Sequence, residues 1–155
     1  MFFESLSPRM AVLAIALAMS GTALAHYGVT GRYDASQPIL ISGIVTQTTF
    51  SPPHPVLAVR VVADQGSSQG LGRPEEYFGP VEARPQDLDQ VLEIELSPVR
   101  RFYDLEETLW PGDEVTLVAL RNCRPPHQLR STWLRLRDGT VVSYDGDWAP
   151  EVDGC

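Results

Sequence analysis

The chain contains no lysine, and none of its methionines lies beyond Met19. Its twelve basic residues are all arginines and stand against twenty acidic residues, which gives a formal net charge of −8. A nucleic-acid-binding protein needs a basic face for the phosphates, so this charge balance argues against such a partner. The lack of thioether groups after Met19 excludes a methionine-rich Cu(I) site. Imidazole, amine and carboxylate groups remain as metal ligands.

Long apolar runs are missing as well. The run from Met10 to Leu17 is too short for a membrane span, which needs roughly 20 apolar residues. Arg9 precedes this run and Ala23-Leu24-Ala25 follows it, as is typical of an export signal and its cleavage site. We therefore expect residues 1–25 to be a signal peptide and His26 to begin the mature chain. The protein is then periplasmic or secreted, without stable membrane insertion.

Only two cysteines are present, Cys123 and Cys155. An exported protein meets an oxidising compartment, where an even pair usually forms a structural disulfide. The alternative, two thiolates that bind a metal or act in redox chemistry, lacks the Cys-x-x-Cys spacing. The sequence therefore predicts a Cys123–Cys155 bridge that holds the C-terminal tail against the end of a strand.

The apolar pattern after the leader is mainly that of β-strands. Residues 91–96 alternate apolar and acidic side chains, and Asp138-Gly139 between two β-rich runs is a strong hairpin signal. Residues 99–109 carry apolar side chains at helical spacing, which predicts a short amphipathic helix. Further strands are expected over residues 38–50, 55–62, 114–121, 133–137 and 140–144.

This order of elements predicts one mainly-β domain over residues 26–155. We expect an OB-like Greek-key barrel of five to six antiparallel strands, with one short helix between the third and fourth strands. A β-sandwich would need more strands in this length. Residues 63–90 are rich in glycine and proline and predict a long loop. That loop is a lid, a partner-binding flap or an insertion, and we favour the insertion.

Several short motifs occur in one order along the chain. They are His26 after the leader, Tyr33-Asp34, the strand Ile41-Ser42-Gly43-Ile44-Val45, the turn from Phe50 to His54, and Trp110-Pro111-Gly112-Asp113-Glu114-Val115. In this the chain resembles a family of small exported bacterial proteins classed as a domain of unknown function. Its members show His-His at the mature start, Phe/Tyr-Asp, Gly-x-Val, Asn-Pro-His and Lys-Pro-Gly-Asp-x-Val. The resemblance implies export and an OB-like barrel, and it supplies no activity. Here Tyr27 replaces the second histidine, and Pro52-Pro53-His54 replaces Asn-Pro-His.

Three histidines follow the leader: His26, His54 and His127. At the mature N-terminus, His26 offers an α-amine and a ring nitrogen, and His54 in the turn after the first strand offers a third nitrogen. Cu(II) prefers such a nitrogen set, so we interpret His26 and His54 as a candidate copper site. The alternative is a solvated N-terminus with His54 and His127 as surface loop residues. A zinc site is less well supported, because structural zinc takes four protein ligands.

No catalytic motif is recognisable, which favours a non-catalytic binding or accessory protein over an enzyme. Its partner is a metal ion, a small ligand or another exported protein. In the alternative interpretation the chain is a ligand- or protein-interaction module without a metal. Such a module uses residues 63–90 and the aromatic side chains of the barrel, which are Phe50, Trp110, Trp133, Tyr144 and Trp148.

Overall fold

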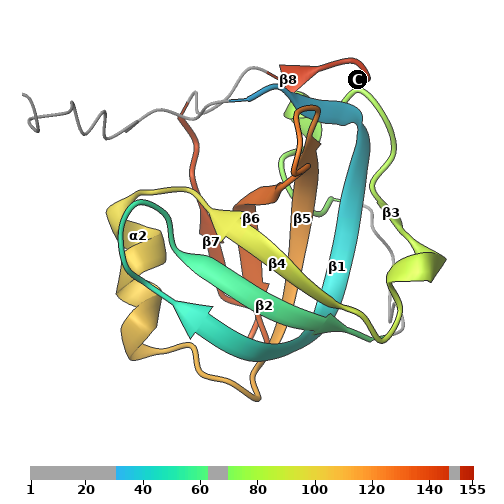
Figure 1. Ribbon diagram of the computed structural model, residues 1–155. Coiled ribbons are helices and arrows are strands. Elements are labelled where there is room, and N and C mark those ends of the chain that lie inside the picture. Colours follow the sequence, from blue (N-terminus) through green and yellow to red (C-terminus); the bar gives the residue numbers. More distant parts are fainter. Residues whose placement is uncertain (1–30, 63–69, 147–150) are drawn as a thin grey trace, which may run out of the picture.

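Strand β1 (Tyr33–Thr49) organises the barrel because it is long enough to pair with two neighbours (Figure 1). Its first part pairs antiparallel with β5 (Glu114–Asn122), and its last part pairs antiparallel with β2 (Val56–Val61). The computed structural model describes residues 31–62, 70–146 and 151–155. The predicted signal peptide, His26 and Trp148 lie outside these ranges.

Three more pairings close the barrel. β2 pairs with β4 (Val91–Leu96), β4 with β6 (Leu129–Leu136), and β6 with β5. The strand order is therefore β1-β2-β4-β6-β5 and back to β1. The prediction of antiparallel strands throughout is wrong at β4 and β6, which run parallel. The antiparallel strand β5 lies between them in sequence, so the chain reverses twice and returns to the direction of β4.

The bend of β1 from one neighbour to the other depends on Gly43. A Cβ atom at this position would lie 2.1 Å from the carbonyl oxygen of Arg60 on β2. The two backbones can therefore approach only because this residue has no side chain. The register shifts between Val45 and Gln47, and such an irregularity bends a strand.

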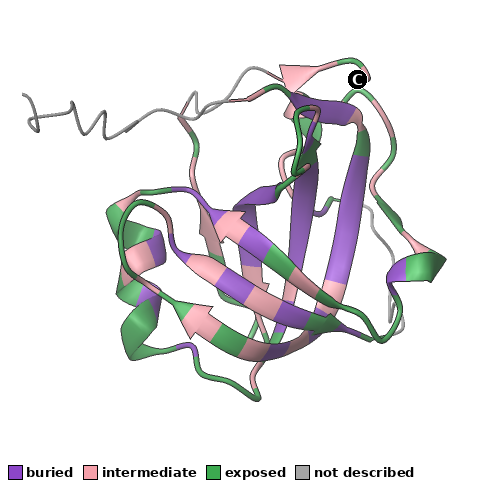
Figure 2. Ribbon diagram, in the orientation of Figure 1, coloured by how far each residue is buried: buried purple, intermediate pink, exposed green. Residues whose placement is uncertain are grey.

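The barrel interior is apolar, as the alternation along the strands predicted (Figure 2). Fully buried side chains from all five strands meet there, including Ile41, Leu57, Ile94, Leu117 and Leu134. Burying each such side chain contributes about 1.5–3 kcal/mol. The fold is mainly β, with a closed five-stranded mixed barrel at its centre.

One end of the barrel is covered by the short helical segment. α2 (Arg100–Tyr103) continues directly into η3 (Asp104–Glu107), and Phe102, Leu105 and Leu109 are buried beneath them. This segment follows β4. The sequence placed it between the third and fourth strands, and this is corrected: it lies after β4, because the short strand β3 (Glu82–Ala83), which was not predicted, precedes β4.

Residues 70–90 form a packed layer on the outside of the barrel, and this part of the predicted long loop contains short elements that the sequence did not indicate. The layer contains η1 (Pro74–Glu76), β3 and η2 (Pro85–Asp87), and β3 pairs with β1. Its apolar side chains cover the outer face of the barrel: Leu71, Tyr77 and Val81 pack with Leu40, Val118 and Trp133. Residues 63–69 lie outside the described ranges.

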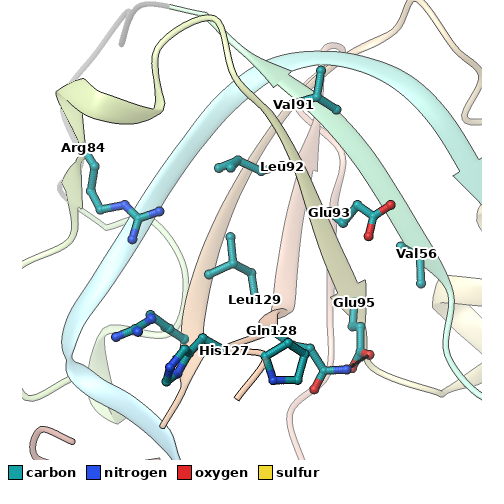
Figure 3. Close-up of a pocket in the computed structure, with 11 residues that line it drawn as sticks. Val56, Arg84, Val91, Leu92, Glu93, Glu95, His127, Gln128 and Leu129 are labelled. Atoms are coloured by element: carbon teal, nitrogen blue, oxygen red, sulfur yellow. Dashed lines mark hydrogen bonds between the residues drawn. The ribbon is translucent and has the colours of Figure 1, made fainter. Parts of the chain in front are cut away.

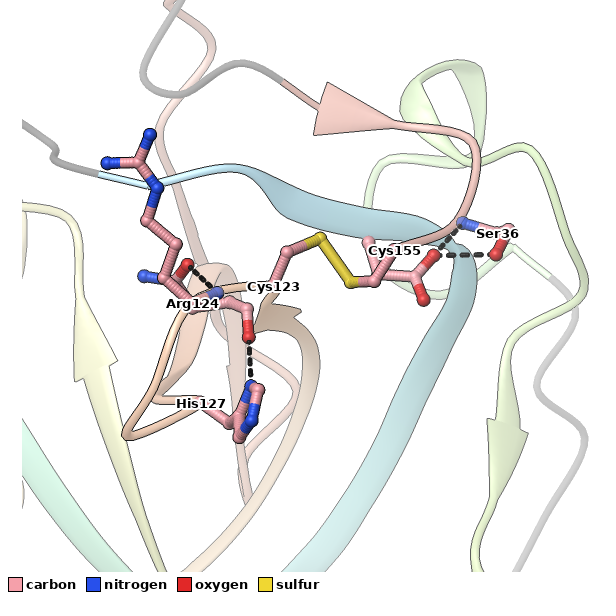
Figure 4. Close-up of a disulfide and its surroundings, with 7 residues drawn as sticks. Ser36, Cys123, Arg124, His127 and Cys155 are labelled. Carbon is pink, nitrogen blue, oxygen red and sulfur yellow. Dashed lines mark hydrogen bonds between the residues drawn. A yellow bond between two sulfur atoms is a disulfide. The ribbon is translucent and has the colours of Figure 1, made fainter.

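The C-terminal part returns to the barrel. β7 (Val141–Ser143) forms the predicted hairpin with β6, and β8 (Glu151–Val152) pairs parallel with the start of β1. The predicted Cys123–Cys155 disulfide is confirmed, with 5.3 Å between the two Cα atoms (Figure 4). A disulfide is consistent with an oxidising extracytoplasmic compartment. Within the described ranges, no helix is both long and apolar enough to cross a membrane.

Candidate functional site

Two of the sequence motifs, the strand at residues 41–45 and the turn at residues 110–115, are hydrogen-bonded to each other in the barrel. The backbone of Val45 bonds to the Pro111-Gly112-Asp113 turn, with 2.8 Å from the Gly112 nitrogen to the Val45 oxygen and 2.9 Å from the Val45 nitrogen to the Asp113 oxygen. Asp113 closes the turn by accepting a hydrogen bond from the Trp110 nitrogen at 2.8 Å. Gly112 has a φ of 102°, a conformation that favours glycine. These motifs therefore fix the connection into β5, and nothing in their geometry requires a ligand.

Two further motifs, Tyr33-Asp34 and the turn that ends at His54, meet at Arg130, which β6 holds almost fully buried at 3% exposure. Its Nη2 donates to Glu95 Oε2 at 2.6 Å, and its guanidinium carbon lies 5.3 Å from the centre of the Tyr33 ring. Nη2 also lies 3.4 Å from His54 Nε2. A cation buried this deeply is tolerated because it is paired with a carboxylate and lies over an aromatic face. The sequence did not single out Arg130, since an arginine within a β-run gives no local signal of a buried ion pair.

His54 is held as a neutral imidazole by these neighbours. Burial and the nearby Arg130 charge lower the pKa of His54 below its usual value, and Glu95 only partly opposes them. A guanidinium only donates hydrogen bonds, so we assign the acceptor role to Nε2 and the ring proton to Nδ1. His54 Nδ1 is buried and has no hydrogen-bond partner among the described residues.

The structure describes only one of the two predicted copper ligands. His26 lies outside the described ranges, and the Nε2 lone pair of His54 faces Arg130. Within the described residues, no group of three or more histidine, cysteine, aspartate and glutamate side chains is arranged to hold a metal. The proximity of His26 and His54 therefore stays a prediction.

His127, the third histidine of the sequence analysis, lies in another loop than His54. It occupies the loop between β5 and β6 with a φ of 64°, and its Nδ1 lies 2.9 Å from the carbonyl oxygen of Asn122. Donation from Nδ1 to this carbonyl would leave Nε2 as the acceptor nitrogen. The sequence suggested only an exposed loop here, because the contact depends on the turn that brings His127 back to Asn122.

A groove of about 670 Å³ opens between β4 and the loop that holds His127 (Figure 3). This volume is in the range of small-ligand sites, which is about 300–1,000 Å³. Leu92 and Leu129 lie within it, and the β4 side carries Val91, Glu93 and Glu95. Gln128 donates to Glu95 Oε1 at 2.9 Å, so both oxygens of that carboxylate are engaged. The wall formed by Glu95 is therefore held in place before any ligand arrives.

The opposite wall of the groove is cationic. It carries Arg84 and Arg121, and these two residues also line a second cavity of about 760 Å³ on their other side. Arg84 forms an ion pair with Asp87 at 2.6 Å. Arg121 is exposed and makes no ion pair with any residue that the structure describes. The groove therefore has one wall with carboxylates and one with a guanidinium, that of Arg121, for which the described part of the chain offers no ion pair.

The groove exists because β4 is only partly paired on this side. Ile94, Glu95 and Leu96 pair with β6, whereas the register pairs Val91, Leu92 and Glu93 with β2 alone. The sheet is therefore open along the first half of β4, at the point where β6 has not yet begun. Sequence patterning predicted β4 accurately but gave no information about its second neighbour.

Compared with known proteins, the chain matches no family model, no curated protein and no solved structure. No family is identified. The resemblance of the motifs to a family of small exported proteins therefore stays an expectation from the sequence. The structure shows a small β-barrel domain of five strands with a groove beside β4.

A pair of carboxyl groups lies away from the groove, where the packed layer meets the tail. Glu76 of η1 contacts Glu151 of β8 and forms an ion pair with Arg73. Burial and the neighbouring Glu151 charge raise the pKa of Glu76 to about 7, although Arg73 opposes them. The pair thus holds a proton at a pH where exposed carboxyl groups are ionised.

Proposed function

We propose that the chain is an exported, non-catalytic binding module built on an OB-type Greek-key barrel, and that the groove beside β4 is its ligand site. The support for the OB type is the connectivity. Counting only the five barrel strands, the spatial order is 1-2-3-5-4-1, and the helical segment joins the third strand to the fourth.

The observation that carries the proposal is where the groove lies. OB-type barrels bind ligands over their second and third strands, between the loops that follow the first and fourth strands. In this chain these parts are β2, β4, residues 50–55 and residues 123–128. The cavity is lined by Val56 of β2, the first half of β4 and Pro126-His127-Gln128.

The charges of the groove argue against nucleic acid as the ligand. Glu93 and Glu95 lie on one wall, and the formal net charge of the whole chain is −8. Phosphates would meet repulsion along the β4 side, because affinity for nucleic acid depends on basic contacts along the backbone. A ligand with apolar groups and one anionic group suits the groove better.

Nuclear magnetic resonance of the ¹⁵N-labelled protein tests this function with three probes: extended hexapeptides, a chito-oligosaccharide and an oligothymidylate. We expect peptides or the oligosaccharide to shift the amide signals of the groove, and the oligothymidylate to leave them unchanged. Val91→Trp narrows the groove and should abolish the shifts. Val141→Trp, at an equally exposed valine that begins β7 (48% against 51%), should preserve them. If neither peptide nor oligosaccharide shifts the groove signals, the groove is not a binding site.

Copper binding through His26 and His54 is a second candidate function. It is favoured by short contacts that lead from the start of the described chain to His54. Gly31 lies against the Asn122 side chain, Asn122 contacts Tyr33, and Tyr33 lies beside the Arg130 that contacts His54. The five residues from 26 to 30 span up to about 17 Å when extended.

The test of the copper site uses the exported protein, with its first residue determined by mass spectrometry. A chain that begins at His26 should bind one Cu(II), and His54→Gln should weaken this binding. An extra residue placed before His26 should also weaken it, because the amine would no longer belong to His26. Unchanged affinity in the extended protein would exclude the amine-based site.

A further inference from the structure

We infer that the groove takes an extended acidic peptide segment, which adds as a strand to the open half of β4. This inference rests on the proposed function of the groove and names its ligand. It is carried by three features: the direction of the β4 backbone groups, the apolar contacts beside them, and the charge of the facing wall.

The register of β4 determines which of its backbone groups bond to β2. The Leu96 nitrogen donates to the Pro55 oxygen at 2.8 Å and the Val61 nitrogen to the Gln90 oxygen at 2.9 Å, so the even-numbered residues of β4 bond to β2. In an antiparallel pair the residues between them direct their N–H and C=O groups to the other edge. Val91, Glu93 and Glu95 therefore face away from β2.

The parallel strand β6 satisfies part of this second edge. Pairing of Ile94 with Leu129 engages the Glu93 carbonyl, and pairing at Glu95 engages both groups of that residue. Three groups on this edge have no partner among the described residues: the Val91 N–H, the Val91 C=O and the Glu93 N–H. Alternate residues of a strand repeat about every 6.8 Å, which is the spacing another extended chain presents. Peptide recognition by strand addition uses such an edge.

The side chains beside this edge suit an extended peptide. Val91 is about half exposed, and Leu92 and Leu129 lie within the groove, so they offer apolar contact to alternate residues of an added strand. An oligosaccharide would gain less from these groups, because its ring faces do not present a row of amides to the strand edge. The backbone groups therefore favour a peptide over a sugar.

The charge of the facing wall selects an acidic segment. Arg121 is exposed without an ion pair among the described residues, and Arg84, which is paired with Asp87, lines the same groove. A carboxylate that reaches across from an added strand would form a charge-assisted hydrogen bond with Arg121. Glu93 on the β4 side would repel the same carboxylate, which fixes the direction in which the acidic side chain points.

The test uses acetylated, amidated hexapeptides of alternating valine and threonine, in which one aspartate is moved along the sequence. Hydrogen exchange should slow at the Val91 and Glu93 amides when the best of these peptides is added, and exchange at Leu92 should stay unchanged because that amide already bonds to β2. A twin peptide with N-methylated amides on the paired edge should bind at least about ten-fold more weakly, since it cannot form the ladder.

Protein variants separate the contribution of the β4 backbone hydrogen bonds from that of the Arg121 charge. Val91→Pro removes one N–H from the groove edge at the first residue of the strand, where proline is tolerated, and should weaken every peptide. Arg121→Gln should weaken the aspartate peptide about ten-fold and leave its asparagine twin unaffected. Arg100→Gln, at an exposed arginine on α2, is the matched control and should have no effect.

The outcomes separate the inference from the proposed function. If the N-methylated twin binds equally well, or no peptide protects the Val91 and Glu93 amides, strand addition is wrong. If the oligosaccharide alone shifts the groove signals, the proposed function stands and the peptide inference fails. If neither class of probe shifts them, both fail.

Discussion

The contact between Glu76 and Glu151 makes the stability of the protein depend on pH in an unusual direction. Most folded proteins gain stability as their paired carboxyl groups ionise. Here the Glu76 side chain is only 20% exposed, and burial together with the Glu151 charge raises its pKa from 4.5 to about 7. The folded chain therefore binds this proton more tightly than the unfolded chain does.

The sign and size of the effect follow from linkage. Between about pH 4.5 and about pH 7 the folded state keeps the proton and the unfolded state releases it, so the free energy of unfolding falls as the pH rises. At 1.36 kcal/mol per pKa unit, the contribution lost over this range is at most about 3.4 kcal/mol. The loss is complete above the folded pKa, where both states carry two carboxylates.

Glu151→Gln removes the like charge but leaves an amide that can donate to Glu76. We expect this variant to match the wild type below about pH 5 and to be more stable than it at about pH 8, by only part of that free energy, because burial, the larger cause of the raised Glu76 pKa, remains. Urea unfolding followed by tryptophan fluorescence measures the difference at each pH. Glu82→Gln is the matched control, because Glu82 is an exposed residue of β3, which also pairs with β1. A difference between Glu151→Gln and the wild type that does not change with pH would refute the shared proton.

Three further predictions test other parts of the structure. The His54 imidazole should titrate below 6.5 in a nuclear magnetic resonance experiment, and stability from this group should be lost as the pH falls below that value; a titration above 6.5 would contradict the burial of its ring. Replacement of Cys123 and Cys155 by serine opens a link across 32 residues and should lower the free energy of unfolding by about 4 kcal/mol, measured by urea unfolding of both proteins. Gly43→Ala should destabilise the barrel by about 1–3 kcal/mol, because its Cβ would meet the Arg60 carbonyl; a thermal unfolding midpoint equal to that of the wild type would show that β1 and β2 can separate without cost.

Local pattern was sufficient for the barrel strands that alternate apolar and polar residues. Residues 91–96 and the Asp138-Gly139 hairpin were predicted closely, because alternation and turn chemistry are both local. The start of β1 at Tyr33 was missed, since the register is irregular between Asp34 and Ile39 and the strand pattern is interrupted there. The packed layer over residues 70–90 was missed because short turns and single apolar contacts hold it to the barrel.

The candidate site was less accessible to sequence reasoning. His54 was singled out, but its partner Arg130 is 76 residues away in the chain, and only the closed barrel brings them together. The groove depends on where β6 begins relative to β4, which is a property of strand register. The disulfide could be predicted because the chain has only two cysteines, which leaves one pairing.

Because β1 pairs with both β2 and β5, it also determines the order in which the parts of the barrel can form. Its pairing with β5 joins Tyr33 to Asn122 and Ile44 to Glu114, residues that are far apart along the chain. A polypeptide released gradually can pair β1 with β2 and β2 with β4 early, but the ring stays open until β5 and then β6, which ends at Leu136, are available. Such non-local closure is typical of proteins that fold in milliseconds to seconds. Until then most of β1 lacks its β5 neighbour, so the apolar side chains of this strand stay uncovered until residue 136 has been made.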